Sequence, residues 1–137
     1  MRRVFVDTLY WIAITNKGDA WHGAAIEAKR RLRHVQTVTT DSVLIEFLGA
    51  VGKTRLLRQI GAELVREILG DNDALIVPQD RDLFLEGLNL YEARRDKGYS
   101  LVDCISMNVM RSMNISDILT NDSHFGQEGF NVLIHQS

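Results

Sequence analysis

The sequence has little cysteine and little proline: Cys104 is its one cysteine and Pro78 its one proline. A single cysteine excludes an internal disulfide, so the chain is not one of the small secreted domains that disulfides hold together. The histidines show no zinc-ligand spacing with Cys104, which we expect to be a small buried hydrophobe. No repeat or linker divides the chain, and we expect residues 1–137 to form a single domain.

Long apolar runs and a strong net charge are also missing. No stretch approaches the roughly 20 apolar residues that a membrane-spanning helix needs. The N-terminal run Val4-Phe5-Val6 is cut by Asp7 and is too short for the core of a signal peptide. We therefore expect a cytoplasmic protein without membrane attachment. The net charge of -2 gives no overall signature of nucleic-acid binding, so any basic surface must be local.

Short apolar runs alternate with helical patterns along most of the chain. Strands are predicted at residues 4–6, 37–40, 74–77, 118–120 and 131–134. Helices are predicted at residues 9–15, 20–32 after a cap at Asp19, 42–51, 54–69, from Asp80 or Asp82 to Arg94, and from a cap at Ser100 to Met113. Such alternation is typical of an α/β sandwich with a mainly parallel, covered sheet.

Three acidic residues lie where the predicted strands end or the next helix begins. Asp7 ends the first strand, Glu46 lies near the start of the helix after the second, and Asp122 follows the fourth by two residues. Ligands of parallel sheets bind beyond the carboxyl ends of the strands, so these acids could gather at one edge. Asp103 joins them only if its helix starts at the same edge.

Each acid also has a purely structural interpretation. Asp103 lies three residues after Ser100, which is the spacing of a helix capping box. Asp7 and Asp122 are equally explained as turn residues at strand ends. Glu46 is the most informative of the four, because it is an isolated charge within an otherwise apolar run.

A cluster of these carboxylates would need a counter-charge. Two like charges about 4 Å apart repel by roughly 4 kcal/mol at an effective dielectric near 20. Mg²⁺ or Mn²⁺ would remove that repulsion, because both prefer hard oxygen ligands and keep water molecules for chemistry. Such ions activate water and stabilise the leaving oxygen of a phosphodiester.

Four segments, taken together and in order, resemble the PIN-domain family, and in particular the VapC-type toxin ribonucleases. They are Val4-Phe5-Val6-Asp7-Thr8, Ile45-Glu46-Phe47-Leu48, Ser100-Leu101-Val102-Asp103-Cys104 and Leu119-Thr120-Asn121-Asp122-Ser123-His124-Phe125. No single segment is specific. The ordered set, with its Thr-x-Asp-x-His-Phe ending, is fairly specific and spans nearly the whole chain.

The resemblance implies a three-layer α/β/α fold with a parallel sheet of about five strands in the order 3-2-1-4-5. It also implies Mg²⁺- or Mn²⁺-dependent cleavage of RNA, with a cognate antitoxin protein and a homodimer as expected partners. The metal-binding and catalytic acids would be Asp7, Glu46, Asp103 and Asp122. Thr8, Ser100 and Asn121 would support the ligands or orient water, whereas His124 and Phe125 are expected to pack.

Other interpretations stay open. Similar PIN folds serve in RNA maturation and decay, and the same fold could be a non-catalytic module that binds RNA or protein. A phosphatase is disfavoured, because Leu9 stands where a second acid after Asp7 is needed. Basic groups within residues 29–33, 53–58 and 94–97 could follow an RNA backbone or simply be solvated helix surface.

Overall fold

The computed structural model describes residues 1–136. The strands are β1 (Arg2–Val6), β2 (Val35–Thr40), β3 (Ala74–Val77), β4 (Asp117–Leu119) and β5 (Asn131–Val132). The helices are α1 (Thr8–Thr15), α2 (His22–Arg30), α3 (Asp41–Val51), α4 (Arg55–Gly70), α5 (Arg81–Ala93), α6 (Leu101–Ser112) and α7 (Ser123–Gln127). Within this part of the chain, no helix combines the length and apolar content needed to cross a membrane.

All strand pairs in the described residues are parallel, and the sheet has the order β3-β2-β1-β4-β5. The central strand is β1, in which Phe5 pairs with Val38 of β2 and with Ile118 of β4. Strand order and orientation both confirm the predicted sheet. The order reverses beside β1, which makes the ends of β1 and β4 the place where such sheets bind ligands.

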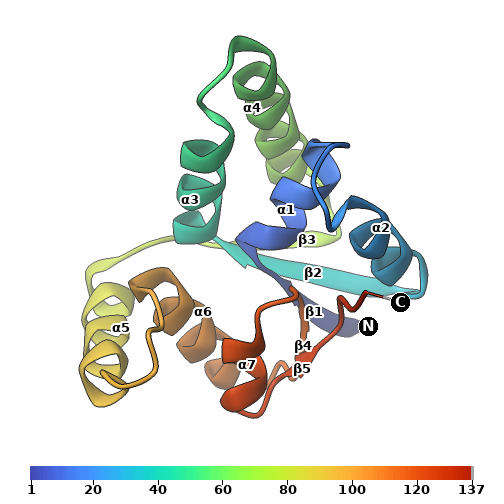
Figure 1. Ribbon diagram of the computed structural model, residues 1–137. Coiled ribbons are helices and arrows are strands. Elements are labelled where there is room, and N and C mark those ends of the chain that lie inside the picture. Colours follow the sequence, from blue (N-terminus) through green and yellow to red (C-terminus); the bar gives the residue numbers. More distant parts are fainter. Residues whose placement is uncertain (137) are drawn as a thin grey trace.

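The helices cover both faces of the sheet (Figure 1). The helices α1 to α4 lie on one side, and α5 to α7 lie on the other. This division follows from right-handed crossovers. The connections from β1 to β2 to β3 step across the sheet in one direction, and those from β3 to β4 to β5 step in the opposite direction, so their helices cover opposite faces. The pair α3 and α4 extends away from the sheet as an arm (Figure 1). The three-layer arrangement therefore matches the predicted fold class.

The core lies on both faces of the sheet around β1. Val4, Phe5 and Val6 are fully buried, which explains why these three positions of β1 are all apolar rather than alternating. Phe47 of α3 and Phe125 of α7 are also fully buried, and each such side chain contributes roughly 1.5–3 kcal/mol by leaving water. The segments that carry Asp7, Glu46 and Asp122 are thus anchored in the core.

The structure shows which residues cap the helices and where the predicted element bounds differ. Asp80 rather than Asp82 caps α5, since its carboxylate accepts a hydrogen bond from the Leu83 amide at 2.8 Å. The cap predicted at Asp19 is wrong: α2 begins at His22, and Asp19 instead accepts from the Trp21 amide in a local turn. The short helix α7 was not predicted, and β5 ends at Val132 instead of reaching residue 134.

Candidate active site

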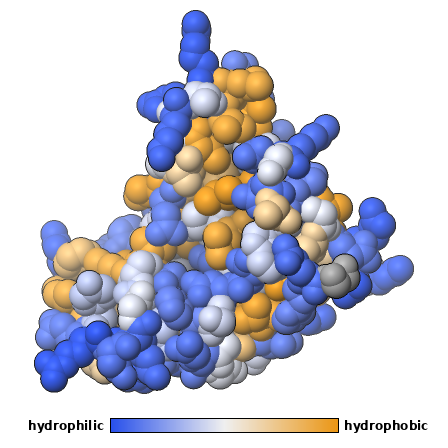
Figure 2. Space-filling model, viewed as in Figure 1, coloured by the Kyte–Doolittle hydropathy of each residue, from blue (hydrophilic) through white to orange (hydrophobic). Residues whose placement is uncertain are grey.

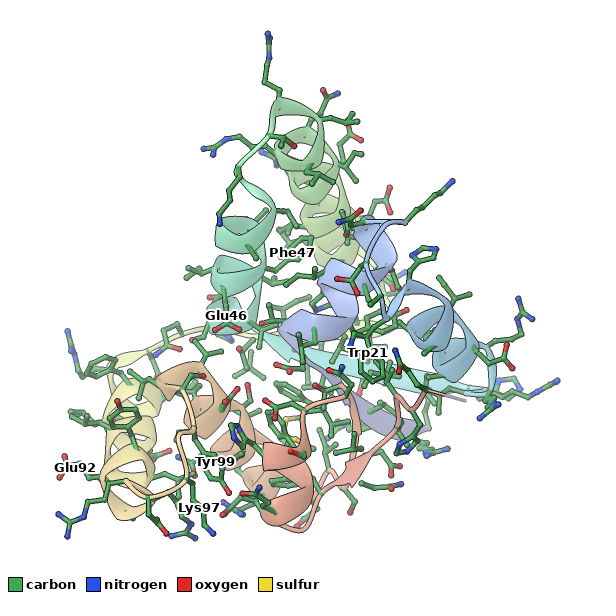
Figure 3. All side chains as sticks on the ribbon, viewed as in Figure 1. Trp21, Glu46, Phe47, Glu92, Lys97 and Tyr99 are labelled. Carbon is green, nitrogen blue, oxygen red and sulfur yellow. The ribbon has the colours of Figure 1, made fainter. Side chains whose placement is uncertain are left out.

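The four predicted acids lie on four segments that begin or end at one edge of the sheet. Asp7 occupies the cap position before α1, but its side chain makes no capping hydrogen bond. Glu46 lies on α3 and lines an apolar groove together with residues of α6 (Figure 3). Asp103 is in the first turn of α6, and Asp122 caps α7 through the His124 amide. The condition set for Asp103, a helix that starts at this edge, is met.

Thr120 connects two of the acids. Its hydroxyl is fully buried, donates to Asp7 Oδ2 at 2.9 Å and accepts from the Asp122 amide at 3.2 Å. One side chain thus orients a carboxylate after β1 and the backbone that carries another after β4. Sequence reasoning did not assign Thr120 to the site, although the residue is part of the Thr-x-Asp segment.

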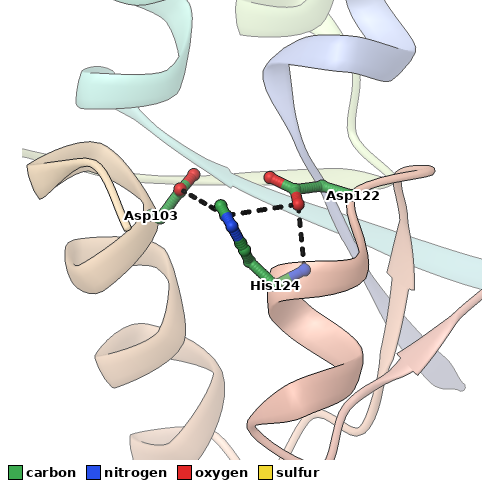
Figure 4. A group of neighbouring side chains, drawn as sticks. All are labelled: Asp103, Asp122 and His124. Carbon is green, nitrogen blue, oxygen red and sulfur yellow. Dashed lines mark hydrogen bonds and ion pairs between the residues drawn. The ribbon is translucent and has the colours of Figure 1, made fainter. Parts of the chain in front are cut away.

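Asp103, Asp122 and His124 form a compact group (Figure 4). Each offers one ligand atom, and these atoms all lie within 4.8 Å of one another. The Nδ1 atom of His124 is 3.4 Å from Asp122 Oδ1 and 3.9 Å from Asp103 Oδ2. The prediction that His124 only packs is incomplete: its ring contacts Tyr99, with centroids 5.1 Å apart, but it also faces both carboxylates.

The capping interpretation of Asp103 is also correct. The Ser100 hydroxyl accepts from the Asp103 amide at 3.0 Å, and the Asp103 carboxylate accepts from the Ser100 amide at 3.1 Å. This reciprocal pair is a complete capping box. It also holds the Asp103 carboxylate in place at the start of α6. Capping and participation in the acidic group are therefore compatible.

The acids share one electrostatic field. Burial, and next the charge of Asp103, raise the pKa of Asp7 to about 7, although the Thr120 hydrogen bond lowers it and Glu46 raises it slightly further. Burial likewise raises the pKa of Asp103, with Asp122 and Glu46 adding to the effect against the opposing hydrogen bonds from Ser100. The cluster thus carries negative charge that its protein neighbours do not compensate.

The residues present fit a divalent cation. Carboxylate oxygens are the ligands that Mg²⁺ and Mn²⁺ prefer, and a histidine nitrogen is acceptable to Mn²⁺. Two buried polar atoms beside the acids, Thr8 Oγ1 and His124 Nδ1, have no hydrogen-bond partner within residues 1–136. Buried polar groups are nearly always satisfied, so these two atoms support a site that takes an additional polar group or ion. Asn121, between Thr120 and Asp122, is half-buried.

Comparison with known proteins shows the family. The family model of the PIN domain matches residues 4–130. The chain belongs to the PIN domain family. This PIN domain is 29% identical, over 133 residues, to the 23S rRNA-specific endonuclease VapC20 of Mycobacterium tuberculosis, in strains CDC 1551 / Oshkosh and ATCC 25618 / H37Rv. The match covers 93% of this chain and 95% of each relative.

A solved structure of a similar protein has the same fold. The crystal structure of VapC20 from Mycobacterium tuberculosis, a sarcin-ricin loop cleaving toxin, resembles this PIN domain with a TM-score of 0.86 and 26% identity. The likeness covers 96% of this chain and 99% of that chain. The family resemblance predicted from four short segments is thereby confirmed along nearly the whole molecule.

The predicted basic groups of this PIN domain differ in what they contact. Arg94 is committed to an ion pair with Glu128 at 3.0 Å, so it does not offer a free charge to RNA. Arg30 and Arg31 lie 3.5 Å from the exposed Glu27, where ion pairs contribute little and the cations stay accessible. Arg58 reaches the carbonyl of Gly52 at the tip of the arm. The groups on the arm remain candidates for phosphate contacts, whereas residues 29–33 directly precede β2 and therefore lie at the edge of the sheet opposite to the acids.

Proposed function

We propose that this PIN domain is a metal-dependent endoribonuclease that acts as the toxin of a toxin–antitoxin pair. The observation that carries the proposal is the shared field of Asp7, Glu46, Asp103 and Asp122, which come from four distant segments to one edge of the sheet. The similarity to an endonuclease over nearly the full chain supports the same reaction class.

Asp7, Asp103 and Asp122 would hold Mg²⁺ or Mn²⁺, and Glu46 would do so directly or through water. When bound, the cation lowers the pKa of a water molecule and stabilises the leaving oxygen of the phosphodiester. The protein itself keeps the ligands in place: Thr120 orients Asp7, and Ser100 orients Asp103. These supports limit ligand motion, on which catalytic geometry depends.

Three neighbours would act on water and substrate. The Thr8 hydroxyl is buried beside Asp7 with no partner in the described residues, which suits it to orient a water molecule or a phosphate oxygen. The Asn121 amide lies next to Asp122 and can donate to the same groups. His124 contributes to the ligand set or holds the two carboxylates at their separation.

The substrate we propose is structured RNA, with ribosomal RNA as the first to be tested. VapC20 is named as specific for 23S rRNA and as cleaving the sarcin-ricin loop. An RNA substrate of this kind would place the enzyme in the cytoplasm. Phosphate contacts would come from the arm, where Lys53, Arg55 and Arg58 are exposed, because backbone charge dominates RNA affinity.

A protein partner is proposed to cover the site. An apolar groove of about 330 Å³ begins at Glu46 and is lined by residues of α3, α5 and α6. Ile45, at 68% exposure, and Phe84, at 37%, leave apolar surface open beside it. Figure 2 shows apolar surface over the arm and beside α5. Such surface suits an antitoxin segment or a second copy of the chain, and light scattering with and without the neighbouring gene product separates the two.

Cleavage of RNA tests the proposal. Purified protein is incubated with 23S rRNA and with a synthetic sarcin-ricin hairpin, in Mn²⁺ or in EDTA. We expect cleavage only with Mn²⁺, and a loss of about 100-fold or more in Asp7→Asn, since a metal ion contributes several kcal/mol to such reactions. The matched control is Asp117→Asn, which removes a carboxylate at the opposite end of β4. Cleavage that persists in EDTA or in Asp7→Asn would refute the proposal.

A non-catalytic PIN module is distinguished by calorimetry. A module that only binds RNA or protein, with the acids as cap residues, should show no saturable Mn²⁺ site. The proposed enzyme should bind Mn²⁺ with a stoichiometry that Asp122→Asn reduces or abolishes. RNA binding without either Mn²⁺ binding or cleavage would favour the binding module.

A further inference from the structure

Glu128 directly follows α7 and has a buried carboxylate with three partners from elsewhere in the chain. Its side chain is 7% exposed. Oε2 accepts from Arg94 Nε at 3.0 Å and from the Tyr99 hydroxyl at 3.0 Å, and Oε1 accepts from Arg111 at 2.7 Å. Burial alone would raise the pKa of Glu128, but these three hydrogen bonds lower it to about 2. The carboxylate is therefore charged and fully engaged.

The partners of Glu128 lie at both ends of α6. Arg94 ends α5, Tyr99 directly precedes the capping residue Ser100, and Arg111 is in the last turn of α6. Arg111 also stacks over the ring of Phe130, with 5.2 Å between the guanidinium carbon and the ring centroid. One carboxylate after α7 thus holds α6 at its beginning and at its end.

The same network reaches the acidic group through Tyr99. Its hydroxyl bonds to Glu128, and its ring contacts His124, which lies between Asp103 and Asp122. Tyr99 is itself buried, and it lies between α6 and α7 in Figure 3. A displacement of Tyr99 would therefore move both the start of α6 and the ring of His124.

The acidic group needs such a restraint. Asp103 is on α6 and Asp122 directly precedes α7, and their carboxylate oxygens lie within 4.8 Å of each other, so the two like charges repel. Without a cation, this repulsion favours separation of the starts of α6 and α7. The ion pairs of Glu128 pull the same two helices together.

We propose that Glu128 is a positioning residue for the acidic group, which holds α6 against α7 so that Asp103 and Asp122 stay at a separation that one cation can bridge. The inference rests on the proposed metal-dependent function, but Glu128 does not touch metal or RNA in it. Glu128 is instead expected to set the affinity for the cation. Arg94 and Arg111 serve the same purpose, which is why they are not available to phosphates.

The test is Mn²⁺ affinity, measured by calorimetry on the metal-free full chain at a temperature where every variant is folded by circular dichroism. Glu128→Gln keeps the shape of the side chain and removes its charge. We expect Mn²⁺ affinity to fall about tenfold, as for supporting residues around metal ligands. Cleavage of the hairpin should fall at low Mn²⁺ and recover toward the wild-type rate at saturating Mn²⁺.

The control for a merely structural ion pair is Asp117→Asn. Asp117 accepts from Arg2 at 2.7 Å and from Asn131, at the other end of the sheet. Asp117→Asn should lower the melting temperature and leave Mn²⁺ affinity unchanged. Equal loss of affinity in both variants, or wild-type affinity in Glu128→Gln, would overturn the inference.

Tyr99→Phe provides the second variant, which decides the matter if Glu128→Gln does not fold. It keeps the ring against His124 and removes only the hydrogen bond to Glu128. A two- to threefold loss of Mn²⁺ affinity supports the inference, and no loss overturns it. If the wild-type chain has no saturable Mn²⁺ site, the proposed function fails and the inference falls with it, whereas normal wild-type binding with unaffected variants defeats the inference alone.

Discussion

At the scale of single residues, the unusual feature is a set of carboxylates placed where their charge is costly. Asp7 is 3% exposed, and its hydrogen bonds from the Thr120 hydroxyl and the Thr8 backbone do not offset the effect of burial on its pKa. Protein interiors tolerate such groups when an ion or a proton is available to neutralise them. The site is therefore expected to respond to both pH and metal.

The first prediction concerns pH and the stability of the metal-free protein. The pKa of Asp7 is about 7 in the folded chain against an ordinary value of 3.8, so between these values the folded state binds more protons than the unfolded state. The free energy of unfolding therefore falls as pH rises from about 4 to 7. Thermal melts in EDTA should show a falling melting temperature across this window, and Asp7→Asn should flatten the slope.

Glu128 does not interfere with that measurement in the part of the window above its ordinary pKa of 4.5. Its pKa is lowered to about 2, so its stabilising contribution is complete above its ordinary value of 4.5 and is lost only in stronger acid. Melting temperatures that rise with pH in wild type, or equal slopes in wild type and Asp7→Asn, would contradict the assignment of Asp7 as a buried, uncompensated acid.

At the scale of elements, the site depends on how α3, α6 and α7 begin. Thr40 caps α3 and Ser100 caps α6, each by accepting from a backbone amide three residues ahead. Asp122 caps α7 while also facing His124. The groups that start these helices are thus the same groups, or neighbours of the groups, that would bind the cation.

The second prediction compares two helix caps. Ser100→Ala removes the cap of α6 and should lower the free energy of unfolding by about 1 kcal/mol. Thr54→Ala removes the cap of α4, which accepts from the Leu57 amide at 3.2 Å on the arm, and should cost a similar amount. Only Ser100→Ala should also weaken Mn²⁺ binding, because the first turn of α6, which carries Asp103, loses the hydrogen bond from the Asp103 amide to the Ser100 hydroxyl. Chemical denaturation and calorimetry provide the two measurements.

Equal Mn²⁺ affinity in the two cap variants would mean that the capping box is a purely structural feature of α6. A loss of affinity in Thr54→Ala would instead indicate that the arm contributes to the metal site. Either result would change the assignment of Ser100.

The elements were largely predictable from sequence, for physical reasons. The buried residues Val4 to Val6 of β1 and the amphipathic α4 have strong patterns, and Ser100 with Asp103 is a local signal that can be read directly. The helix α7 has only five residues, too few to show a period, so it was missed. Asp19 was predicted to be a cap because a capping residue type precedes the helical spacing; its side chain does accept from a backbone amide, but in a turn before the helix.

Two supports of the site, Thr120 and Glu128, were not predictable, because they depend on contacts between distant segments. Thr120 and Asp7 are 113 residues apart, and Glu128 lies 34 residues from Arg94. No periodicity or short motif reports such pairs. His124 carried a signal, its spacing of two residues from Asp122, but that spacing also suits a packing residue. Asp7, Glu46 and Asp122 were predicted because the strand ends of a parallel sheet meet at one edge, whereas the prediction of Asp103 rested mainly on the family resemblance.

At the scale of the whole molecule, metal and folding should be linked. A ligand that binds only the folded state stabilises it by about 2.7 kcal/mol at one hundred times its Kd. For a chain of 137 residues, this corresponds to a rise in melting temperature of roughly 10 °C. The third prediction is that Mn²⁺ raises the melting temperature of the wild-type chain by an amount of this order.

Asp103→Asn should separate the two effects of charge. It removes one member of a repelling group, so the metal-free melting temperature should rise, while the increase caused by Mn²⁺ should shrink. Differential scanning fluorimetry with and without Mn²⁺ measures both quantities. Unchanged behaviour on both counts would show that Asp103 is only a helix-cap residue.

The central claim is that the four acids form one metal-dependent site that cleaves RNA. The most direct measurement follows cleavage of the sarcin-ricin hairpin and Mn²⁺ binding over the same Mn²⁺ range, in wild type and in Asp7→Asn, Glu46→Gln, Asp103→Asn and Asp122→Asn. The account predicts that rate and occupancy rise together in wild type, and that each variant loses about 100-fold or more in rate while Asp117→Asn does not. Cleavage at the wild-type rate in any two acid variants, or cleavage without bound Mn²⁺, would contradict it.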